Sequence, residues 1–181
     1  MHLTREQLEA GLEPIRSAPK GEGRLDLIVC RPDLGERREL SEATIDPIIG
    51  LVGDNWSTRG SRHTADGGPE PDHQITITSA RALALIAGDR SRWPLAGDQL
   101  YVDLDISEDA LPVGAHLSIG STVLEVSPAP HKGCAKYAAR FGREALRFVQ
   151  SPEGRALRLR GLHAVVVEGG TVQLGDAVRS L

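Results

Sequence analysis

The sequence predicts a mainly β fold of the α+β class, a closed antiparallel β-barrel with a few short helices. Short apolar or alternating runs dominate the chain after residue 94. The dipeptides Gly120-Ser121 and Gly169-Gly170 separate two pairs of these runs, as in tight hairpins. Closing such strands into a barrel also removes exposed sheet edges. With 181 residues, 40% of them hydrophobic, the chain is expected to form a single domain, residues 1–181.

The first half of the chain predicts one helix, one strand and one long loop. Residues 4–12 form the helix, because Thr4 and Gln7 have the spacing of a capping box. Residues 24–31 form the strand, and their alternating pattern indicates one core face. Residues 50–73 contain five glycines and two prolines and almost no apolar periodicity. So long a loop is expected to be either functional or partly disordered.

The second half alternates between short strands and helical segments. Residues 74–78 predict a strand that leads into a helix at 80–87, which Ser79 caps. A helical insertion is expected at 133–162. Further short strands are expected at residues 99–104, 116–119, 122–126, 164–167 and 171–174.

Charge and hydrophobicity exclude some classes of partner. The chain has 21 Lys and Arg residues against 25 Asp and Glu residues, a formal charge of −4. We therefore expect no binding to nucleic acid or to an anionic membrane surface. The sequence has no apolar run of membrane-spanning length and no apolar segment of a signal peptide at its start. A cytoplasmic location is expected, in which both cysteines stay thiols.

Cys134 is the main candidate for chemistry. It stands directly before a predicted helix, and His131, Lys132 and Lys136 are its sequence neighbours. Helix N–H groups and these cations would stabilise the thiolate, which could attack, carry sulfur or bind a soft metal. The alternative is a small apolar residue under a loop. Cys30, at the end of a strand, is interpreted as a core residue.

Polar residues elsewhere are candidates for binding an anionic ligand. Arg59 and Arg62 in the long loop can supply paired guanidinium donors, with His63 beside them. Asp54 and Asp98 each follow a glycine and are candidates for the same site, although Gly-Asp is also a common turn. The sequence contains no zinc-type Cys-x-x-Cys or His-Glu-x-x-His pattern, no P-loop and no nucleophile elbow.

The order of these features resembles that of the MOSC domain, the module named after the C-terminal part of the eukaryotic molybdenum cofactor sulfurases. The resemblance is clearest over residues 72–178, which leaves residues 1–50 as a leading helix and strands that pack on or complete the barrel. The residues that carry it are Gly53-Asp54, Gly97-Asp-Gln-Leu100, Leu117-Ser-Ile-Gly120, Val123-Leu-Glu-Val126, Cys134, Gly161-Leu-His-Ala-Val165 and Gly170-Thr-Val-Gln-Leu-Gly-Asp176.

The resemblance implies a β-barrel with Cys134 beside a cleft, and two roles for that cysteine. Members of the family are thought to carry sulfur on it as a persulfide, or to use it as the thiolate ligand of a molybdenum–pterin cofactor. In this reading His131, Lys132 and Lys136 support the thiolate, and the long loop helps to hold an anionic phosphate or pterin. Where many members have a Pro-Cys pair preceded by arginine, this chain has His131-Lys-Gly-Cys134.

The implied partners differ between the alternatives. A sulfur carrier needs a cysteine desulfurase, and any pyridoxal phosphate belongs to that partner, since no site for it is recognised in this chain. A molybdenum-dependent reductase of N-hydroxylated compounds needs an electron-transfer partner, because the chain lacks cysteines for an iron–sulfur cluster. The third alternative is a non-catalytic accessory barrel whose long loop contacts another protein.

Overall fold

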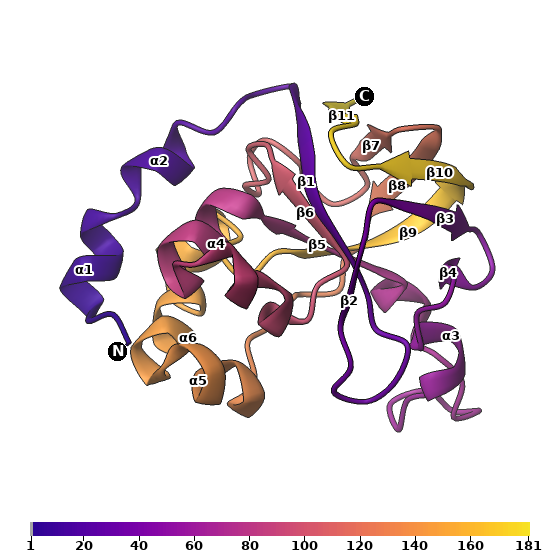
Figure 1. Cartoon of the computed structure of the whole chain (residues 1–181), viewed down its shortest axis with the longest axis horizontal. Helices are drawn as coiled ribbons and strands as arrows, with labels where there is room; N and C mark the ends of the chain where they lie inside the picture. The colour runs from indigo at the N-terminus through magenta and orange to yellow at the C-terminus, as the bar shows by residue number, and fades with distance from the viewer. Residues whose placement is uncertain (1) are drawn as a thin grey trace.

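A closed ring of seven strands forms the centre of the computed structural model, which describes residues 2–181 (Figure 1). Pairing of the last strand with the first closes the ring. An additional short strand, β2 (Arg38–Leu40), pairs antiparallel with the C-terminal end of β1. The expected closed barrel of the α+β class is therefore confirmed. Around the ring the strands are β11 (Ala177–Ser180), β7 (His116–Ile119), β8 (Thr122–Val126), β9 (Leu162–Glu168), β5 (Ile75–Ser79), β6 (Leu100–Asp103) and β1 (Glu22–Cys30).

One pair of strands in the ring is parallel, so the expectation of a purely antiparallel barrel is wrong. β5 and β6 run in the same direction, with Ile77 opposite Leu100. Parallel neighbours need a crossover connection. The helix α4 (Ala80–Ala87) and the 3-10 helix η2 (Arg90–Ala96) provide it. Ser79 caps α4 as expected, accepting a hydrogen bond from the backbone of Ala82.

Both faces of β1 are buried, which corrects the prediction of a single core face. A β-bulge lies between Leu25 and Leu27 in the pairing with β6. Leu25, Ile28 and Cys30 therefore face the barrel interior, whereas Leu27 and Val29 face the helices. Cys30 is 4% exposed, which confirms its interpretation as a core residue.

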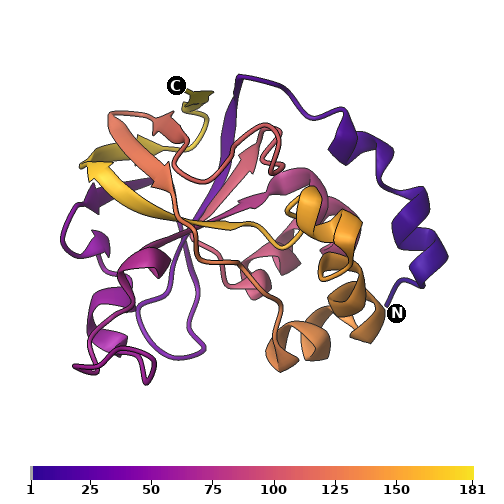
Figure 2. The ribbon, with the colours of Figure 1, turned by 180° about the vertical axis from the view of Figure 1, so that it is seen from behind.

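Most of the helices gather on one side of the barrel, on the left in Figure 1 and on the right in Figure 2, whereas α3 (Trp56–Arg59) lies on the opposite side. They share a second apolar core with the outer faces of β1 and β6. Thr4 and Gln7 form the expected capping box. None of the helices within residues 2–181 is long and apolar enough to cross a membrane. The remaining members of this layer are α1 (Arg5–Ala10), α2 (Glu13–Arg16), α5 (Ala135–Phe141), α6 (Arg143–Val149) and α7 (Pro152–Ala156).

A small second sheet lies on the opposite side, and it overturns one of the two expected hairpins. β10 (Gly170–Gln173) pairs with β3 (Glu42–Asp46), which also pairs with β4 (Gly50–Leu51). Gly169 and Gly170, at the start of β10, permit close packing instead of forming a tight turn. A Cβ on Gly169 would lie 2.7 Å from the Pro47 side chain, and one on Gly170 would lie 2.6 Å from the Ser121 carbonyl oxygen.

The long loop is built from short elements beside this sheet. After β4 it forms α3 (Trp56–Arg59), and it ends in the 3-10 helix η1 (Pro71–His73), which leads into β5. The loop therefore has a defined path along the barrel opposite the main helices (Figures 1 and 2).

The other expected hairpin, β7 to β8 through Gly120-Ser121, is confirmed. Gly120 has φ +54°, and a Cβ there would lie 2.4 Å from the Thr171 carbonyl oxygen. Gly114 has φ +83° and no heavy atom of the described residues within 4 Å of its Cβ position.

We predict that Gly114→Ala lowers the free energy of unfolding by about 1 kcal/mol, from backbone strain alone. Gly120→Ala should cost at least about 2 kcal/mol more, because the methyl group meets backbone. Urea unfolding of both variants measures this, and equal losses would contradict the close contact.

Candidate functional site

Cys134 lies at the mouth of a cleft of about 230 Å³. It precedes α5 with an extended backbone, φ −127° and ψ 178°, and its side chain is exposed. The chain reaches this position from β8 through a proline-containing turn that keeps Cys134 out of the core. The thiol is therefore open both to the cleft and to solvent.

Five segments that are distant in sequence line the cleft, including α3 with the residue before it and α5 with Cys134 before it. The loop that follows β1 hangs between α3 and α5 in both views (Figures 1 and 2). The end of η2 and the residue after it contribute Ala96 and Gly97, and Arg160, which precedes β9, completes the lining. The side chains and glycines that line the cleft are Arg31, Asp33, Leu34, Gly35, Arg37, Asn55, Arg59, Ala96, Gly97, Cys134, Lys136, Tyr137, Arg140 and Arg160.

The cleft carries an excess of positive charge that no carboxylate neutralises. Arg37, Arg59, Lys136 and Arg140 form no ion pair within residues 2–181. Asp33 is the single acidic residue in the described lining. Burial, with the guanidinium of Arg140 next in effect, lowers the pKa of Arg37. Like charges held together in this way favour the binding of an anion.

Arg31 is fixed in the cleft wall by Asp54, which explains the position of one predicted site residue. The Arg31 Nε and Nη2 atoms lie 2.8 and 2.9 Å from the two oxygens of Asp54, and Nη1 donates to the Gly97 carbonyl at 3.0 Å. The Asp54 side chain is fully buried and does not line the cleft. The structure thus places Asp54 as the counterion that orients Arg31.

Asp98 holds a second arginine in the same manner. Its side chain is fully buried, with Arg160 Nη1 at 2.7 Å and His131 Nε2 at 2.6 Å. Burial alone would raise the pKa of Asp98, but Arg160 and His131 outweigh burial and lower it. Burial, with Arg160 next in effect, lowers the pKa of His131 to about 4. The His131 ring is therefore directed at Asp98, and it does not line the Cys134 cleft.

Three histidine rings form a stack behind this ion pair. The ring centroids of His73 and His163 lie 4.2 Å apart, and those of His163 and His131 lie 4.3 Å apart. The Nδ1 atom of His163 is buried without a hydrogen-bond partner. Burial, followed by the neighbouring His131, lowers the pKa of His163 to about 2. His131 and His163 are therefore neutral at physiological pH.

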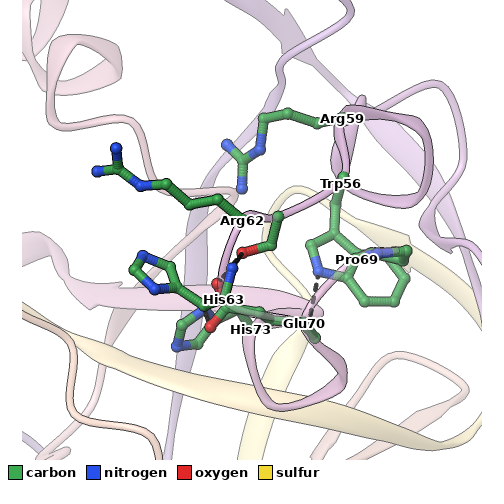
Figure 3. A pocket seen from close by; sticks show the side chains of 9 residues that line it. Trp56, Arg59, Arg62, His63, Pro69, Glu70 and His73 are labelled. Atoms are coloured by element: carbon green, nitrogen blue, oxygen red, sulfur yellow. Dashed lines mark hydrogen bonds and ion pairs between the residues drawn. The ribbon is translucent and has the colours of Figure 1, made fainter. Parts of the chain in front are cut away.

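Arg62 and His63 lie in a separate cavity of about 240 Å³ (Figure 3). This cavity, here called the loop pocket, is lined by Trp56, Arg59, Gly60, Ser61, Arg62, His63, Pro69, Glu70 and His73. Arg59 lines both the loop pocket and the cleft. The long loop therefore borders the cleft through Asn55 and Arg59, whereas Arg62 and His63 lie outside the cleft lining.

The sequence predicts only part of the cleft. Of the residues proposed from sequence, Cys134, Lys136 and Arg59 come together in it, whereas Lys132 is exposed and outside its lining. Four cationic side chains of the cleft were not predicted from the sequence: Arg31, Arg37, Arg140 and Arg160. The position of Arg31 directly after a strand was a usable signal. The other three sit in a chain rich in arginine, where no local pattern separates them.

Comparison with known proteins defines the family. The family model for the MOSC domain matches residues 62–179. Because this match spans more than half of the chain, the chain belongs to the MOSC domain family. A comparison with curated protein sequences gives no match.

Solved structures show the same fold at low sequence identity. The YuaD protein from Bacillus subtilis has a TM-score of 0.67 at 17% identity, with 88% of this chain and 95% of that chain covered. YiiM from Escherichia coli has a TM-score of 0.57 at 18% identity, covering 87% of this chain and 69% of that one. YiiM from Geobacillus stearothermophilus has a TM-score of 0.61 at 13% identity, covering 88% and 75%.

Removal of the buried Asp98 charge should destabilise the folded protein. Asp98→Asn removes the charge that balances the buried Arg160 guanidinium, which is 11% exposed. We expect the free energy of unfolding to fall by about 3–5 kcal/mol, since breaking a buried pair leaves an uncompensated charge. Asp33→Asn, an exposed change in the same cleft, should cost less than about 0.5 kcal/mol. Chemical denaturation compares the two, and equal stability of both variants would contradict the role of Asp98.

The free energy of unfolding should decrease as the pH falls below about 6.5, because folding lowers the pKa values of His131 and His163. The unfolded chain binds protons at His131 and His163 near their usual pKa of 6.5, but the folded protein does so only near 4 and 2. The unfolded state therefore holds more protons as the pH falls below 6.5, and stability decreases in that direction. The loss between pH 7 and pH 4 should be on the order of 3 kcal/mol for each histidine.

Substitutions identify the groups responsible for this pH dependence. His163→Phe keeps an aromatic ring in the stack and should reduce the slope of stability against pH by roughly half. His116→Gln is the control, because His116 is partly exposed beside Glu125. Urea unfolding at pH 7, 6, 5 and 4 measures the slopes. A slope that His163→Phe leaves unchanged would rule out this account.

Proposed function

We propose that the cleft binds an anionic molybdenum–pterin cofactor, with the Cys134 thiolate as the protein ligand of the metal. The observation that carries the proposal is the position of Cys134 on a cleft with four cationic side chains free of carboxylate partners. A thiolate is a soft ligand suited to a metal whose other ligands come from its own organic group. The family resemblance supports the same assignment.

Polar atoms in the lining fit a bound group with hydrogen-bonding edges. Asn55 Oδ1, Tyr137 Oη and Arg160 Nε are buried and have no hydrogen-bond partner among residues 2–181. All three residues line the cleft. Buried polar atoms normally have partners, so unpaired ones at a cleft wall support a ligand site. A pterin offers donors and acceptors, and its phosphate offers negative charge, so the lining suits both parts.

The arginines that line the cleft form two groups: those paired with a buried carboxylate and those without a carboxylate partner among residues 2–181. Arg31 and Arg160 are held by buried carboxylates, so they present a fixed surface and lose little entropy when a ligand binds. Arg37 and Arg140 have backbone carbonyl partners at 3.2 and 2.6 Å, and their charges remain available for a phosphate. Lys136 adds a further cation to the cleft wall that holds Cys134.

In this proposal the bound group supplies the oxidation–reduction chemistry, and the chain binds and orients it. The residues that hold it are Cys134 toward the metal and the cleft arginines toward the phosphate. Turnover as a reductase of N-hydroxylated compounds requires an electron-transfer partner. Such a partner could approach the cleft, because Cys134 is exposed. We also propose a cytoplasmic location, where a free thiol at this position persists.

A second candidate is a sulfur carrier. Cys134 is exposed, so a cysteine desulfurase could deliver sulfane sulfur to its thiolate. A persulfide needs an accessible thiolate but has no need of a cleft with four unpaired cations. The charge of the lining therefore favours the cofactor over the persulfide. An accessory barrel without chemistry would need neither feature.

The test compares metal retention in two cysteine variants. Expressed in a host that makes the cofactor, the protein should retain molybdenum, and Cys134→Ser should lower the molybdenum content per chain at least about tenfold through loss of the soft ligand. Cys30→Ala is the matched control, because Cys30 lies in the barrel core. Elemental analysis of the purified proteins gives the content.

Intact mass distinguishes the alternatives on the same samples. Absence of molybdenum from the native protein, or equal molybdenum in Cys134→Ser, would contradict the proposal. A sulfur-sized mass gain that depends on Cys134 and a desulfurase, and that a reductant removes, would favour the sulfur carrier. Neither signal would favour the accessory barrel.

A further inference from the structure

We propose that the loop pocket is a phosphate-binding subsite adjacent to the Cys134 cleft. The pocket has its own lining and its own cations, and it meets the cleft at Arg59. The cationic side chains of the pocket suit a phosphate group, which offers several oxygens as hydrogen-bond acceptors. Phosphate binding in this pocket does not require molybdenum.

Two guanidinium groups provide most of the positive charge in the pocket. Arg59 and Arg62 form no ion pair within residues 2–181. Figure 3 shows both side chains extending toward the same side of the pocket, with the imidazole rings of His63 and His73 below them. Guanidinium groups bind phosphate with paired N–H donors, and two of them can serve different oxygens of one group.

The acidic residue of the pocket already has partners. Glu70 accepts a hydrogen bond from Ser61 and lies 2.9 Å from His73 Nδ1. The bond from Ser61, with burial opposing it, lowers the pKa of Glu70. The Glu70 backbone carbonyl accepts from Trp56 Nε1 at 3.1 Å. Glu70 therefore anchors the base of the pocket and does not pair with Arg59 or Arg62.

The loop that carries Arg62 and His63 is pinned by its own backbone. Gly60 has φ +67°, and a Cβ there would lie 2.6 Å from the Gly67 carbonyl oxygen, so the two strands of the loop nearly touch. The Thr64 hydroxyl lies within hydrogen-bond distance of the carbonyls of Ser61 and Gly68, at 3.0 and 2.7 Å. Pinning of the backbone reduces the backbone entropy that is lost when an anion binds.

The phosphate can come from two sources. One is a free phosphate ion or a small phosphomonoester that occupies the loop pocket alone. The other is the terminal phosphate of a longer ligand whose remainder lies in the cleft, with Arg59 between the two parts. The second source rests on the proposed function. Because the cofactor's own phosphate is assigned to Arg37 and Arg140 in the cleft, the longer ligand is a phosphorylated substrate that extends toward Cys134.

The experiment is a titration of the purified, molybdenum-free protein with inorganic phosphate, followed by amide NMR at constant ionic strength. We expect saturable shifts at residues 60–63 and 70–73. Chloride at the same ionic strength should not produce them, because screening alone has no preferred site. Absence of saturation, or equal shifts with chloride, would overturn the subsite.

Single-charge variants show which cation is responsible. Arg62→Gln should weaken phosphate binding at the loop pocket at least about tenfold, through loss of a bidentate donor. Arg155→Gln removes the same charge from an exposed position in α7 that lines neither cavity. It should leave the affinity within about twofold. Equal weakening by both variants would reduce the effect to the general field of the protein and overturn the proposal.

A longer probe separates the two sources. ADP, which joins a planar heterocycle to a diphosphate, should shift residues 60–63 and 134–137 with one midpoint if a single ligand spans both cavities. Arg140→Gln, in the cleft alone, should then weaken ADP binding but not inorganic phosphate binding. Shifts confined to the loop pocket support the free anion as the source. Because no molybdenum is present, a failure of metal retention leaves this result intact.

Discussion

Two buried carboxylates hold the cleft in place. Asp54 and Asp98 are fully buried, and each fixes one arginine of the cleft wall, Arg31 and Arg160 respectively. A buried charge is tolerated only when it is paired and hydrogen-bonded. The same pairs that satisfy this constraint therefore set the directions of two guanidinium groups. The positive surface beside Cys134 depends on them.

The barrel brings these pairs together at one of its ends. Arg31 follows the last residue of β1, Asp98 precedes β6 and Arg160 precedes β9. Pairing of β1 with β6 and of β5 with both β6 and β9 makes these strand ends neighbours. Residues far apart in sequence thus become one wall. The mixed topology, with its parallel β5–β6 pair, is what places Asp98 beside Arg160.

The sequence predicts the local features well because neighbouring residues determine them. The capping of α1 by Thr4, the Gly120-Ser121 hairpin and the place of Cys134 directly before a helix all follow from short patterns. The second hairpin failed because β10 pairs with the distant β3. Arg37 and Arg140 were missed for the same reason. Their place in the cleft depends on long-range packing, which no local pattern shows.

The fold thus provides a fixed cationic surface, and the turn before α5 provides an accessible thiol beside it. The central claim is that one ligand uses both. An anomalous difference map at the molybdenum edge, from crystals of protein made in a cofactor-producing host, tests this most directly. The account predicts a metal peak at bonding distance from Cys134 Sγ, with phosphate density against Arg37 and Arg140. A peak remote from Cys134, or metal bound with the cleft arginines uncontacted, would contradict it.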